Sequence, residues 1–419
     1  VDVDEGFKFV KGIKDAVWSL KEIDNTLFCG HDTGTSIIEN NIAKKIEGVQ
    51  QGTWDIKPIN ESKDLLLQGN YNGLYVLHKI NNNWVYRNKV KGFDLSSKFF
   101  EIYNNHIFVS HEYKGVFKIK IDDDFTKAIA IEKDASIGKE INSSLIKYND
   151  DLLFSYKEGV LKYNIEKNEF LKDTILSTLF NKEEYTSGRL VYNNKNTNTL
   201  WAFSKSSLNY LSPDKLTSIP KINKISFSKH LPKGVTGYET ISHLDNRRYL
   251  IGTSAGFIIV DLDKVNHKNY NITINSITTS NIDKEEEIVN ISTNGFFKNK
   301  QNDIEFTFSV TEFEKYLDTE YQYQLEGMYS KWSSWSENAS TLFKNLSYGD
   351  YVFKVRARVG NNMTKNAASY SFTIDRPWYL TKTMIGAYMF LVLLFSFLMH
   401  NIYKRYYKKQ RERLLLRTT

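Results

Sequence analysis

One phrase recurs six times in the first 265 residues and limits the fold more than any other feature of this chain. It consists of an apolar strand, a short polar turn that usually ends in glycine, and a second apolar strand. Examples are "LLLQGNYNGLYVL" from residue 65 and "YLIGTSAGFIIV" from residue 249. Because glycine adopts positive φ angles without a Cβ clash, it lets the second strand fold back on the first. The turn residues are Gly34, Gly73, Gly115, Gly159 and Gly256, with Ser206-Ser207 in the fifth repeat.

The spacing of the turns indicates the architecture. Successive turns lie between 39 residues (Gly34 to Gly73) and 49 residues (Ser207 to Gly256) apart. A further short strand precedes each phrase, which gives three or four strands per repeat, and helical periodicity is nearly absent. Repeats of this length and composition are typical of propeller blades. We therefore predict a β-propeller over residues 1–267 with six recognisable blades, and leave open whether the set is complete at the N-terminus.

The pattern changes at about residue 268, where longer strands alternate apolar and polar residues. In "YVFKVRARV", Tyr351 and every second residue after it lie on one face, while Lys354, Arg356 and Arg358 lie on the other. This period of two is typical of a half-exposed antiparallel strand. About one hundred residues with such strands predict a β-sandwich of immunoglobulin or fibronectin type over residues 268–375.

The C-terminal region carries an uncharged apolar run over residues 383–403. As a helix, at about 1.5 Å per residue, this run spans roughly 30 Å, the thickness of a bilayer core. Trp378 and Tyr379 precede it as an interfacial aromatic belt would, and Lys404 and Arg405 mark its cytoplasmic end. We therefore predict a single-pass helix in the cytoplasmic (inner) membrane, with residues 1–382 periplasmic or extracellular and a cytoplasmic C-terminus.

Two short segments flank the predicted span. Residues 376–382 form a junction that Pro377 stiffens. Residues 404–419 form a basic juxtamembrane segment, which either begins a coiled coil or lies on anionic lipid. This segment holds seven basic residues and one acidic residue, or +6, of a total net charge of +7, which leaves +1 for the rest of the chain. Because the basicity belongs to this segment alone, we expect no nucleic-acid partner for the domains that precede it.

The repeats resemble the two-component regulator propeller, in the runs "WSL" with "LFCGHDTG" and "YLIGTSAGF". The run "YQYQLEGMYSKWSSWSENASTLFKNLSYGDYVFKVRARV" resembles the triple-tyrosine (Y_Y_Y) domain, which follows such propellers in large bacterial membrane sensors. Phe343 departs from that pattern, since the family commonly has a tyrosine there, and we expect its packing to be kept. The matching residues, expected to be mostly structural, are Tyr321, Tyr323, Gly327, Trp332, Trp335, Gly349 and Tyr351.

Aromatic residues of the second domain allow two interpretations. Tyr321, Tyr323, Trp332 and Trp335 would form a platform on which sugar rings stack, or they would be core and edge aromatics of the sandwich. We favour the second interpretation.

Motifs of catalysis and cofactor binding are missing from the sequence. It holds no Gly-rich phosphate loop, His-Glu-x-x-His, Cys-x-x-Cys or Gly-x-Ser-x-Gly. We therefore predict no catalytic, cofactor or metal site and no enzyme activity. His31-Asp32 and His111-Glu112 lie in blade turns and could converge on a metal or a sugar, but we favour ordinary surface turns. Ligand contacts cannot be named, because the sequence does not say which loops face which end of the propeller.

The order of propeller, triple-tyrosine domain and membrane helix resembles that of single-pass sensors. It implies that the external domains of a dimer detect a glycan or protein ligand and signal through the helix to an output beyond residue 419. In such sensors the output is a histidine kinase or a LuxR-type DNA-binding domain, and "YKRYYKKQRERLL" favours the second. The alternatives are a membrane-tethered scaffold subunit of a cell-envelope complex, and an anchored propeller hydrolase or lyase.

Overall fold

A computed structural model describes residues 9–59, 64–193, 198–212, 220–231, 233–265, 268–281, 284–312, 316–360 and 362–415. The chain divides into two compact units, residues 1–266 and 267–419. The boundary predicted between residues 267 and 268 adjoins positions 266 and 267, which lie outside the described residues. The mainly β class predicted from the sequence is confirmed.

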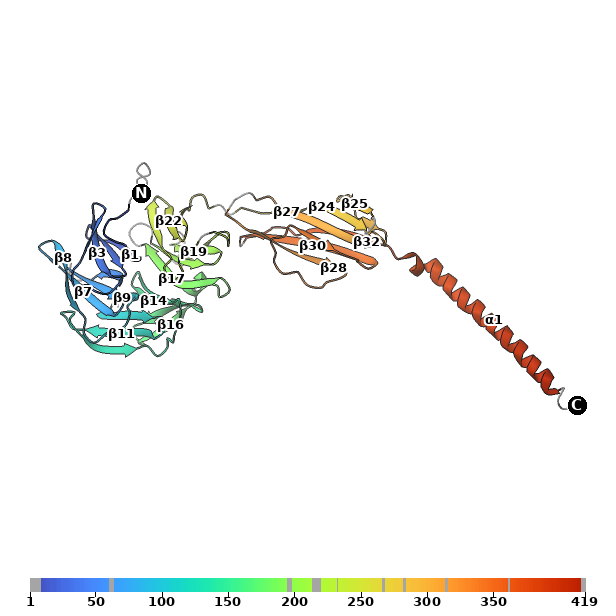
Figure 1. The fold of residues 1–419 in the computed structure, drawn as a ribbon, viewed down its shortest axis with the longest axis horizontal. Coiled ribbons are helices and arrows are strands. Elements are labelled where there is room, and N and C mark those ends of the chain that lie inside the picture. The colour runs from blue at the N-terminus through green and yellow to red at the C-terminus, as the bar shows by residue number, and fades with distance from the viewer. Residues whose placement is uncertain are drawn as a thin grey trace. The chain divides into compact units, whose positions relative to one another are not determined.

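The first unit is a propeller of antiparallel sheets that follow one another around a common centre (Figure 1). Five sheets have four strands, and the last, β21-β22-β23, has three among the described residues. The strands of the first three sheets are β1 (Val17–Ile23), β2 (Thr26–His31), β3 (Gly34–Glu39), β4 (Ile42–Lys45), β5 (Thr53–Pro58), β6 (Leu65–Asn70), β7 (Gly73–Ile80), β8 (Asn83–Lys89), β9 (Phe99–Tyr103), β10 (His106–His111), β11 (Gly115–Ile121) and β12 (Ala128–Lys133). The remaining strands are β13 (Ser144–Tyr148), β14 (Asp151–Tyr156), β15 (Gly159–Asn164), β16 (Glu169–Asp173), β17 (Tyr185–Asn193), β18 (Thr199–Ser204), β19 (Ser207–Ser212), β20 (Lys221–Ser226), β21 (Ile241–Asp245), β22 (Arg248–Thr253) and β23 (Gly256–Asp261), with the short helix η1 (Leu176–Leu179) after β16.

The glycine turns join the second and third strands of each blade. Gly34 and Gly73 have φ angles of +145° and +134°. A Cβ at Gly34 would lie 2.7 Å from the carbonyl oxygen of Val49, and one at Gly73 would lie 2.5 Å from that of Phe93. Both the backbone conformation and the close approach of the next linker therefore require glycine.

Asparagine forms the other hairpins of the blades, a signal that the sequence prediction did not use. Asn81 and Asn82 join β7 to β8 with φ angles of +48° and +67°, and Asn104 and Asn105 join β9 to β10 with +48° and +55°. Two successive residues with positive φ form the turn whose twist matches that of the flanking strands. Each blade therefore combines a glycine turn with asparagine turns.

Neighbouring blades pack through apolar clusters. Leu66 and Leu67 are adjacent on β6, yet Leu66 packs toward Phe28 of the first blade and Leu67 toward Phe100 of the third. Similar clusters join the third blade to the fourth, the fourth to the fifth and the fifth to the sixth. Successive residues of a strand point to opposite faces, so each sheet contributes to two interfaces.

The second unit contains a β-sandwich and a long helix. One sheet has the order β25-β24-β27-β29 and the other has the order β26-β32-β30-β28, with β31 paired to β30. Phe306 and Phe353, from opposite sheets, stack with ring centroids 3.9 Å apart in the shared core. The strands are β24 (Ile272–Asn281), β25 (Lys284–Ile288), β26 (Gly295–Phe297), β27 (Asp303–Val310), β28 (Thr319–Glu326), β29 (Ser340–Phe343), β30 (Gly349–Val359), β31 (Asn362–Met363) and β32 (Ala368–Ile374).

Strand β30 alternates as its sequence predicts. Tyr351 and every second residue to Val359 are buried, whereas Lys354, Arg356 and Arg358 are partly exposed. Phe343 is buried against Phe306 and Phe353, at centroid distances of 6.1 Å in both cases. An apolar ring therefore fills the place where the family commonly has tyrosine.

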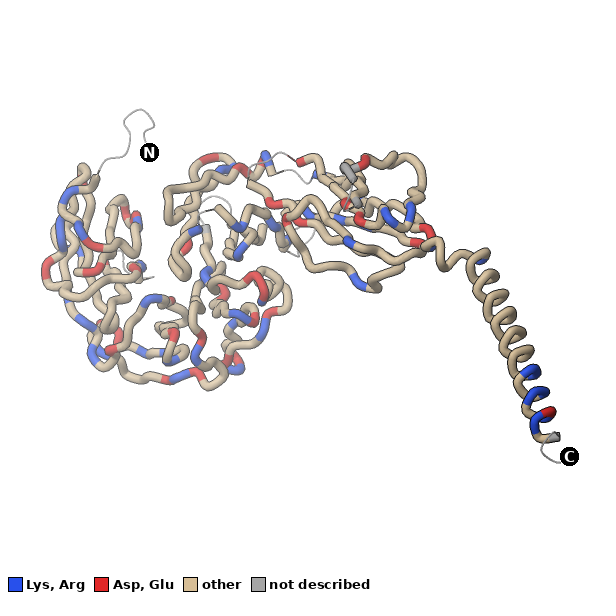
Figure 2. The backbone as a smooth tube through the Cα atoms, turned by 45° about the vertical axis from the view of Figure 1, so that its right-hand side comes forward, with Lys and Arg blue, Asp and Glu red and all other residues tan. Residues whose placement is uncertain are grey.

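A short helix, η2 (Trp378–Leu380), leads to α1 (Lys382–Leu415). The most apolar 18-residue window of α1 has a mean hydropathy of 1.9, so this helix is long and apolar enough to cross a membrane. Its basic residues gather in its C-terminal part (Figure 2). The helix therefore continues from the predicted span into the predicted basic segment, of which residues 416–419, including Arg417, lie outside the described residues.

Replacing Gly69 by alanine should destabilise the propeller. A Cβ there would overlap the carbonyl oxygen of Ser97 and the ring of Phe100, both in the next blade. We expect a loss of about 1–3 kcal/mol in the free energy of unfolding, as for other overpacked sites. Thermal or urea unfolding of the solubilised chain measures it. Gly138→Ala is the control, because a Cβ there meets nothing within 4 Å; equal stability of the two variants would contradict the packing described.

Candidate functional site

The first strands of the blades bring charged residues together at the centre of the propeller. Lys21 on β1 and Lys57 on β5 lie 2.8 and 3.8 Å from carboxylate oxygens of Asp55. Lys57 also lies 2.6 Å from Glu101 on β9. Arg189 on β17 interacts electrostatically with Asp55 and Glu101. We call these five residues, together with Glu239, the central charge network.

Burial and pairing set the protonation of this network. Burial alone would raise the pKa of Asp55, but the ammonium groups of Lys21 and Lys57 hold it below its usual value. Burial lowers the pKa of Arg189 and raises that of Glu239. The Glu239 carboxylate accepts hydrogen bonds from Ser187 Oγ at 2.9 Å and from the Gly237 amide at 2.8 Å. The network thus contains three cations and three carboxylates, which offset one another.

Four aromatic side chains gather beside this network, and we call them the aromatic mouth. Trp18 and Trp54 lie with ring centroids 5.0 Å apart. Tyr71 lies 4.6 Å from Trp54, and Tyr238 lies 5.1 Å from Trp18. All four side chains are partly exposed. They present a surface of ring faces and edges to solvent, a composition common in ligand sites.

Polar groups surround the aromatic mouth. Trp18 Nε1 donates to Asp32 at 3.1 Å and to the Tyr71 hydroxyl at 2.7 Å, and the Tyr71 hydroxyl donates to Asp32. Burial and the bond to Asp32 raise the pKa of Tyr71 to about 12, so its hydroxyl stays protonated as a donor. Lys98 Nζ lies 3.8 Å from the centre of the Tyr238 ring and 3.6 Å from Glu112. Burial lowers the pKa of Lys98.

Turns of three blades supply part of this surface. Asp32, Tyr71 and Glu112 each follow the last residue of the second strand in their blades. Both Asp32 and Glu112 act electrostatically on Tyr238. We expected His31-Asp32 and His111-Glu112 to be ordinary surface turns, and the structure instead brings their carboxylates to one aromatic cluster.

His31 itself points into the first blade. Its Nε2 lies 3.0 Å from Ser36 Oγ, and its Nδ1 lies 3.2 Å from Thr33 Oγ1 and 3.6 Å from Asp15. This order of carboxylate, imidazole and hydroxyl resembles a catalytic triad, but Ser36 is only 2% exposed. A buried hydroxyl offers a substrate no access, so the arrangement serves the stability of the blade.

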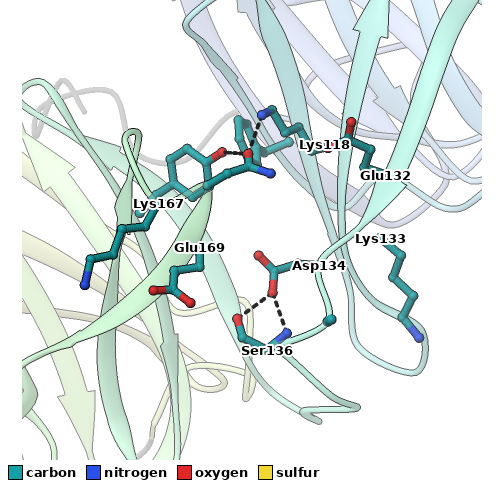
Figure 3. Close-up of a pocket in the computed structure, with 11 residues that line it drawn as sticks. Lys118, Glu132, Lys133, Asp134, Ser136, Lys167 and Glu169 are labelled. Atoms are coloured by element: carbon teal, nitrogen blue, oxygen red, sulfur yellow. Dashed lines mark hydrogen bonds between the residues drawn. The ribbon is translucent and has the colours of Figure 1, made fainter.

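A groove at the boundary of the third and fourth blades is a second candidate. It has a volume of about 540 Å³. Lys118, Glu132, Lys133 and Asp134 line one wall, and Lys167 and Glu169 line the other (Figure 3). Asp134 accepts hydrogen bonds from Ser136, while Lys133 and Lys167 point away from the groove (Figure 3). Cations and acids are equal in number there and do not converge, so the aromatic mouth is the better site.

The residues matched to the triple-tyrosine pattern have partners within the sandwich. Tyr321 is buried, Tyr323 packs edge-on to Phe343 at 5.9 Å, and the Tyr351 hydroxyl donates to Ser347 O at 2.9 Å. Gly327 has a φ of +97°, and a Cβ there would lie 2.7 Å from Asp350 O. Gly349, with a φ of +148°, begins β30.

The two tryptophans of that pattern lie under arginines of β30. The guanidinium of Arg356 lies 4.3 Å from the ring centre of Trp332, and that of Arg358 lies 4.5 Å from that of Trp335. Such stacking uses the ring faces that a sugar would need.

The residues predicted at the membrane interface are exposed. Trp378 and Tyr379, both on η2, are 70% and 48% exposed. Lys404 and Arg405 lie on α1 and are also exposed. Large exposed aromatics beside an apolar helix fit the headgroup region of a bilayer.

Comparison with known proteins assigns part of the second unit. Residues 312–375 match the Y_Y_Y domain. The sandwich carries a Y_Y_Y domain. This stretch includes β28 to β32 and every residue matched to the triple-tyrosine pattern from the sequence. Among curated proteins, none matches the chain.

Solved structures with a similar fold come from bacteria. The extracellular domain of BT3049 from B. thetaiotaomicron, described as a hybrid two-component system, is 17% identical with a TM-score of 0.53, over 87% of this chain and 56% of its own. That of BT4673 from the same organism, described as a one-component system, is 15% identical with a TM-score of 0.42, over 88% and 58%. PorZ of Porphyromonas gingivalis, a surface component of the type-IX secretion system, is 10% identical with a TM-score of 0.39, over 86% and 51%. This chain therefore spans little more than half the length of these structures, and the first of them supports the order of propeller and Y_Y_Y sandwich.

Sequence reasoning missed the aromatic mouth and the central charge network. Trp18 and Trp54 share one signal, since each stands near the start of the first strand of its blade. Tyr238 and Lys98 precede such strands as well. Aligning the blades on their turn glycines and comparing first-strand residues would have brought these positions together.

The pH dependence of stability should reveal the burial of His31. Burial lowers the pKa of this imidazole below its ordinary 6.5. Below pH 6.5 the unfolded chain therefore binds more protons at this residue than the folded chain, so stability falls as the pH drops toward the folded-state pKa. His31→Gln should flatten this fall in thermal unfolding between about pH 7 and pH 5. An unchanged slope would show that His31 does not titrate between the two states.

Proposed function

We propose that this chain is the sensing and membrane-spanning part of a single-pass signalling protein, and that it binds its ligand at the aromatic mouth. The observation that carries the proposal is the convergence of Trp18, Trp54, Tyr71 and Tyr238 from separate parts of one propeller. The Y_Y_Y domain and the apolar helix α1 support the membrane sensor as its context.

The proposed ligand is a glycan. A sugar ring has a flat C–H face that stacks on indole and phenol rings, and hydroxyls that need donors and acceptors. Asp32 and Glu112 supply acceptors, and Lys98 supplies a donor, within the same surface. Because the central charges offset one another, the site favours an uncharged ligand over an anion or a cation.

The proposed topology follows the positive charge. Lys404, Arg405 and the basic residues after them lie on the cytoplasmic side, which places residues 1–382 outside the cytoplasmic membrane. Two copies pass the signal through paired helices to a LuxR-type DNA-binding domain or a histidine kinase. The chain itself binds and does not catalyse, in keeping with the burial of Ser36 beside His31.

Substituting the aromatic mouth should abolish recognition while leaving the fold intact. We expect Trp54→Ala to weaken glycan binding at least tenfold, since a central aromatic contact contributes over about 1 kcal/mol. Tryptophan fluorescence titration of the solubilised chain against a glycan panel measures the affinity. The matched control is Trp332→Ala, which removes an aromatic of the sandwich. Equal losses in both variants, or none in the first, would refute the site.

Lengthening the junction tests the signalling route. The helix α1 begins eight residues after β32 ends at Ile374, with Pro377 and η2 between them. Inserting a flexible Gly-Ser stretch after Asp375 should uncouple ligand binding from output, because the sandwich could then move without moving the helix. Binding should stay unchanged while expression of the controlled genes becomes insensitive to ligand. Normal signalling in the insertion variant would exclude this route.

A further inference from the structure

The sixth blade has an apolar face that its neighbours in the propeller would lead one to expect buried. The residue after the turn packs against the next blade and is at most 1% exposed in four blades, at Leu74, Val116, Val160 and Leu208. In the sixth blade the same position, Phe257, is 48% exposed. Ile259 is also 48% exposed, although its equivalent in the second blade, Val76, is fully buried.

The first blade exposes the opposite face. Leu20 pairs with Cys29 on β2 and is 60% exposed. Its equivalents in other blades pack against the preceding blade and are 1–5% exposed, at Ile56, Leu145, Leu190 and Ile241. A hollow of about 330 Å³ adjoins Leu20, with mostly apolar side chains around it, including Val17 and Ile38. Apolar clusters join each of the other successive blades, and among the described residues none joins the sixth blade to the first.

The chain enters the first blade as though it came from another blade. Lys91 links the outer strand of the second blade, β8, to the third blade, and bridges β12 by the bonds Lys91 N to Thr126 O at 2.9 Å and Ala128 N to Lys91 O at 2.8 Å. Lys11 bridges β4 in the same way, by Lys11 N to Asn41 O at 2.9 Å and Ala43 N to Lys11 O at 2.8 Å.

The sequence repeats with these bonds. "VKGI" from residue 10 corresponds to "VKGF" from residue 90. Gly12 and Gly92 have φ angles of +101° and +92°. Residues 10–13 thus have the conformation and the partners of a linker between blades, and what leads into Val10 takes the place of an outer strand.

We propose that a seventh, four-stranded blade closes this propeller. It packs between the sixth blade and the first, and its outer strand leads into Val10 from the N-terminal side of the same polypeptide. One face covers Phe257 and Ile259, and the other covers Val17 and Leu20. A repeat of the observed spacing, 39 (Gly34 to Gly73) to 49 residues (Ser207 to Gly256), supplies the four strands. The inference rests on blade packing and is independent of the proposed ligand.

Accessibility of single cysteines tests the seventh blade. Cys29 is the only cysteine of the chain and is buried, so Cys29→Ser gives a background without reactive thiols. Ile259→Cys reports on the face of the sixth blade, and Ile80→Cys is its matched control, because Ile80 is 47% exposed on the second blade. Each variant is produced both from its own gene and as residues 1–419 alone, then labelled with a bulky maleimide.

The proposal predicts protection at residue 259 only in the protein made from its own gene. There we expect labelling of residue 259 at least tenfold slower than that of residue 80, and similar rates at the two positions in residues 1–419 alone. Equal rates at the two positions in the gene product would overturn the proposal. Protection that appears in residues 1–419 alone, and weakens on dilution, would instead show a second copy covering this face.

Thermal unfolding provides a measurement that does not need labelling. In the gene product, Ile259→Ser should lower the Tm as much as Val76→Ser does, since both would then lie in interfaces between blades. Ile80→Ser should leave it unchanged. A Tm change for Ile259→Ser no larger than for Ile80→Ser would also refute the seventh blade.

Discussion

Packing of one blade face against the next is the interaction on which the rest of this propeller depends. Each sheet is thin and apolar on both sides, as Leu66 and Leu67 show by facing opposite neighbours. A single blade cannot bury both faces alone, so its stability comes from the blades beside it. The same requirement makes Leu20 and Ile259, at the two unmatched faces, informative about what completes the ring.

The charges at the centre are held in place by this packing. Lys21, Asp55 and Lys57 would repay little of their desolvation cost if the first strands could move, since the attraction between buried ions falls quickly with distance. Strong interfaces between blades fix those strands, and each charge then has partners of the opposite sign. The rigid frame also fixes Trp18 and Trp54, so a ligand at the aromatic mouth meets a surface that needs little reorganisation.

The sequence predicted what depends on local chemistry and failed where distant segments meet. Glycine at Gly34 and Gly73 is required by its own φ angle and its close neighbours, so a repeat of turns was readable. The alternation of β30 was readable for the same reason. In contrast, Trp18 and Tyr238 are 220 residues apart, and nothing near either residue says that the rings meet at 5.1 Å. His31 and Asp32 illustrate the difference, since adjacent residues of one turn point to separate places, one into the blade and one to the aromatic mouth.

Strand β32 connects the sandwich to the membrane helix, and its position in the sheet limits how the helix can respond. It pairs with β30 along its length and, in parallel, with β26 near its end. The Asp375 amide then bonds Phe297 O at 2.9 Å, and the Arg376 guanidinium lies 5.6 Å from the ring centre of Tyr348. Only a few residues later, the Thr381 carbonyl accepts the first bond of α1, from Ile385 at 3.0 Å. Because hydrogen bonds on both sides hold the strand, a force applied at the sandwich reaches the helix through a junction with few free backbone torsions. A change in the sandwich would therefore move or turn the helix as a whole rather than being absorbed in a flexible linker.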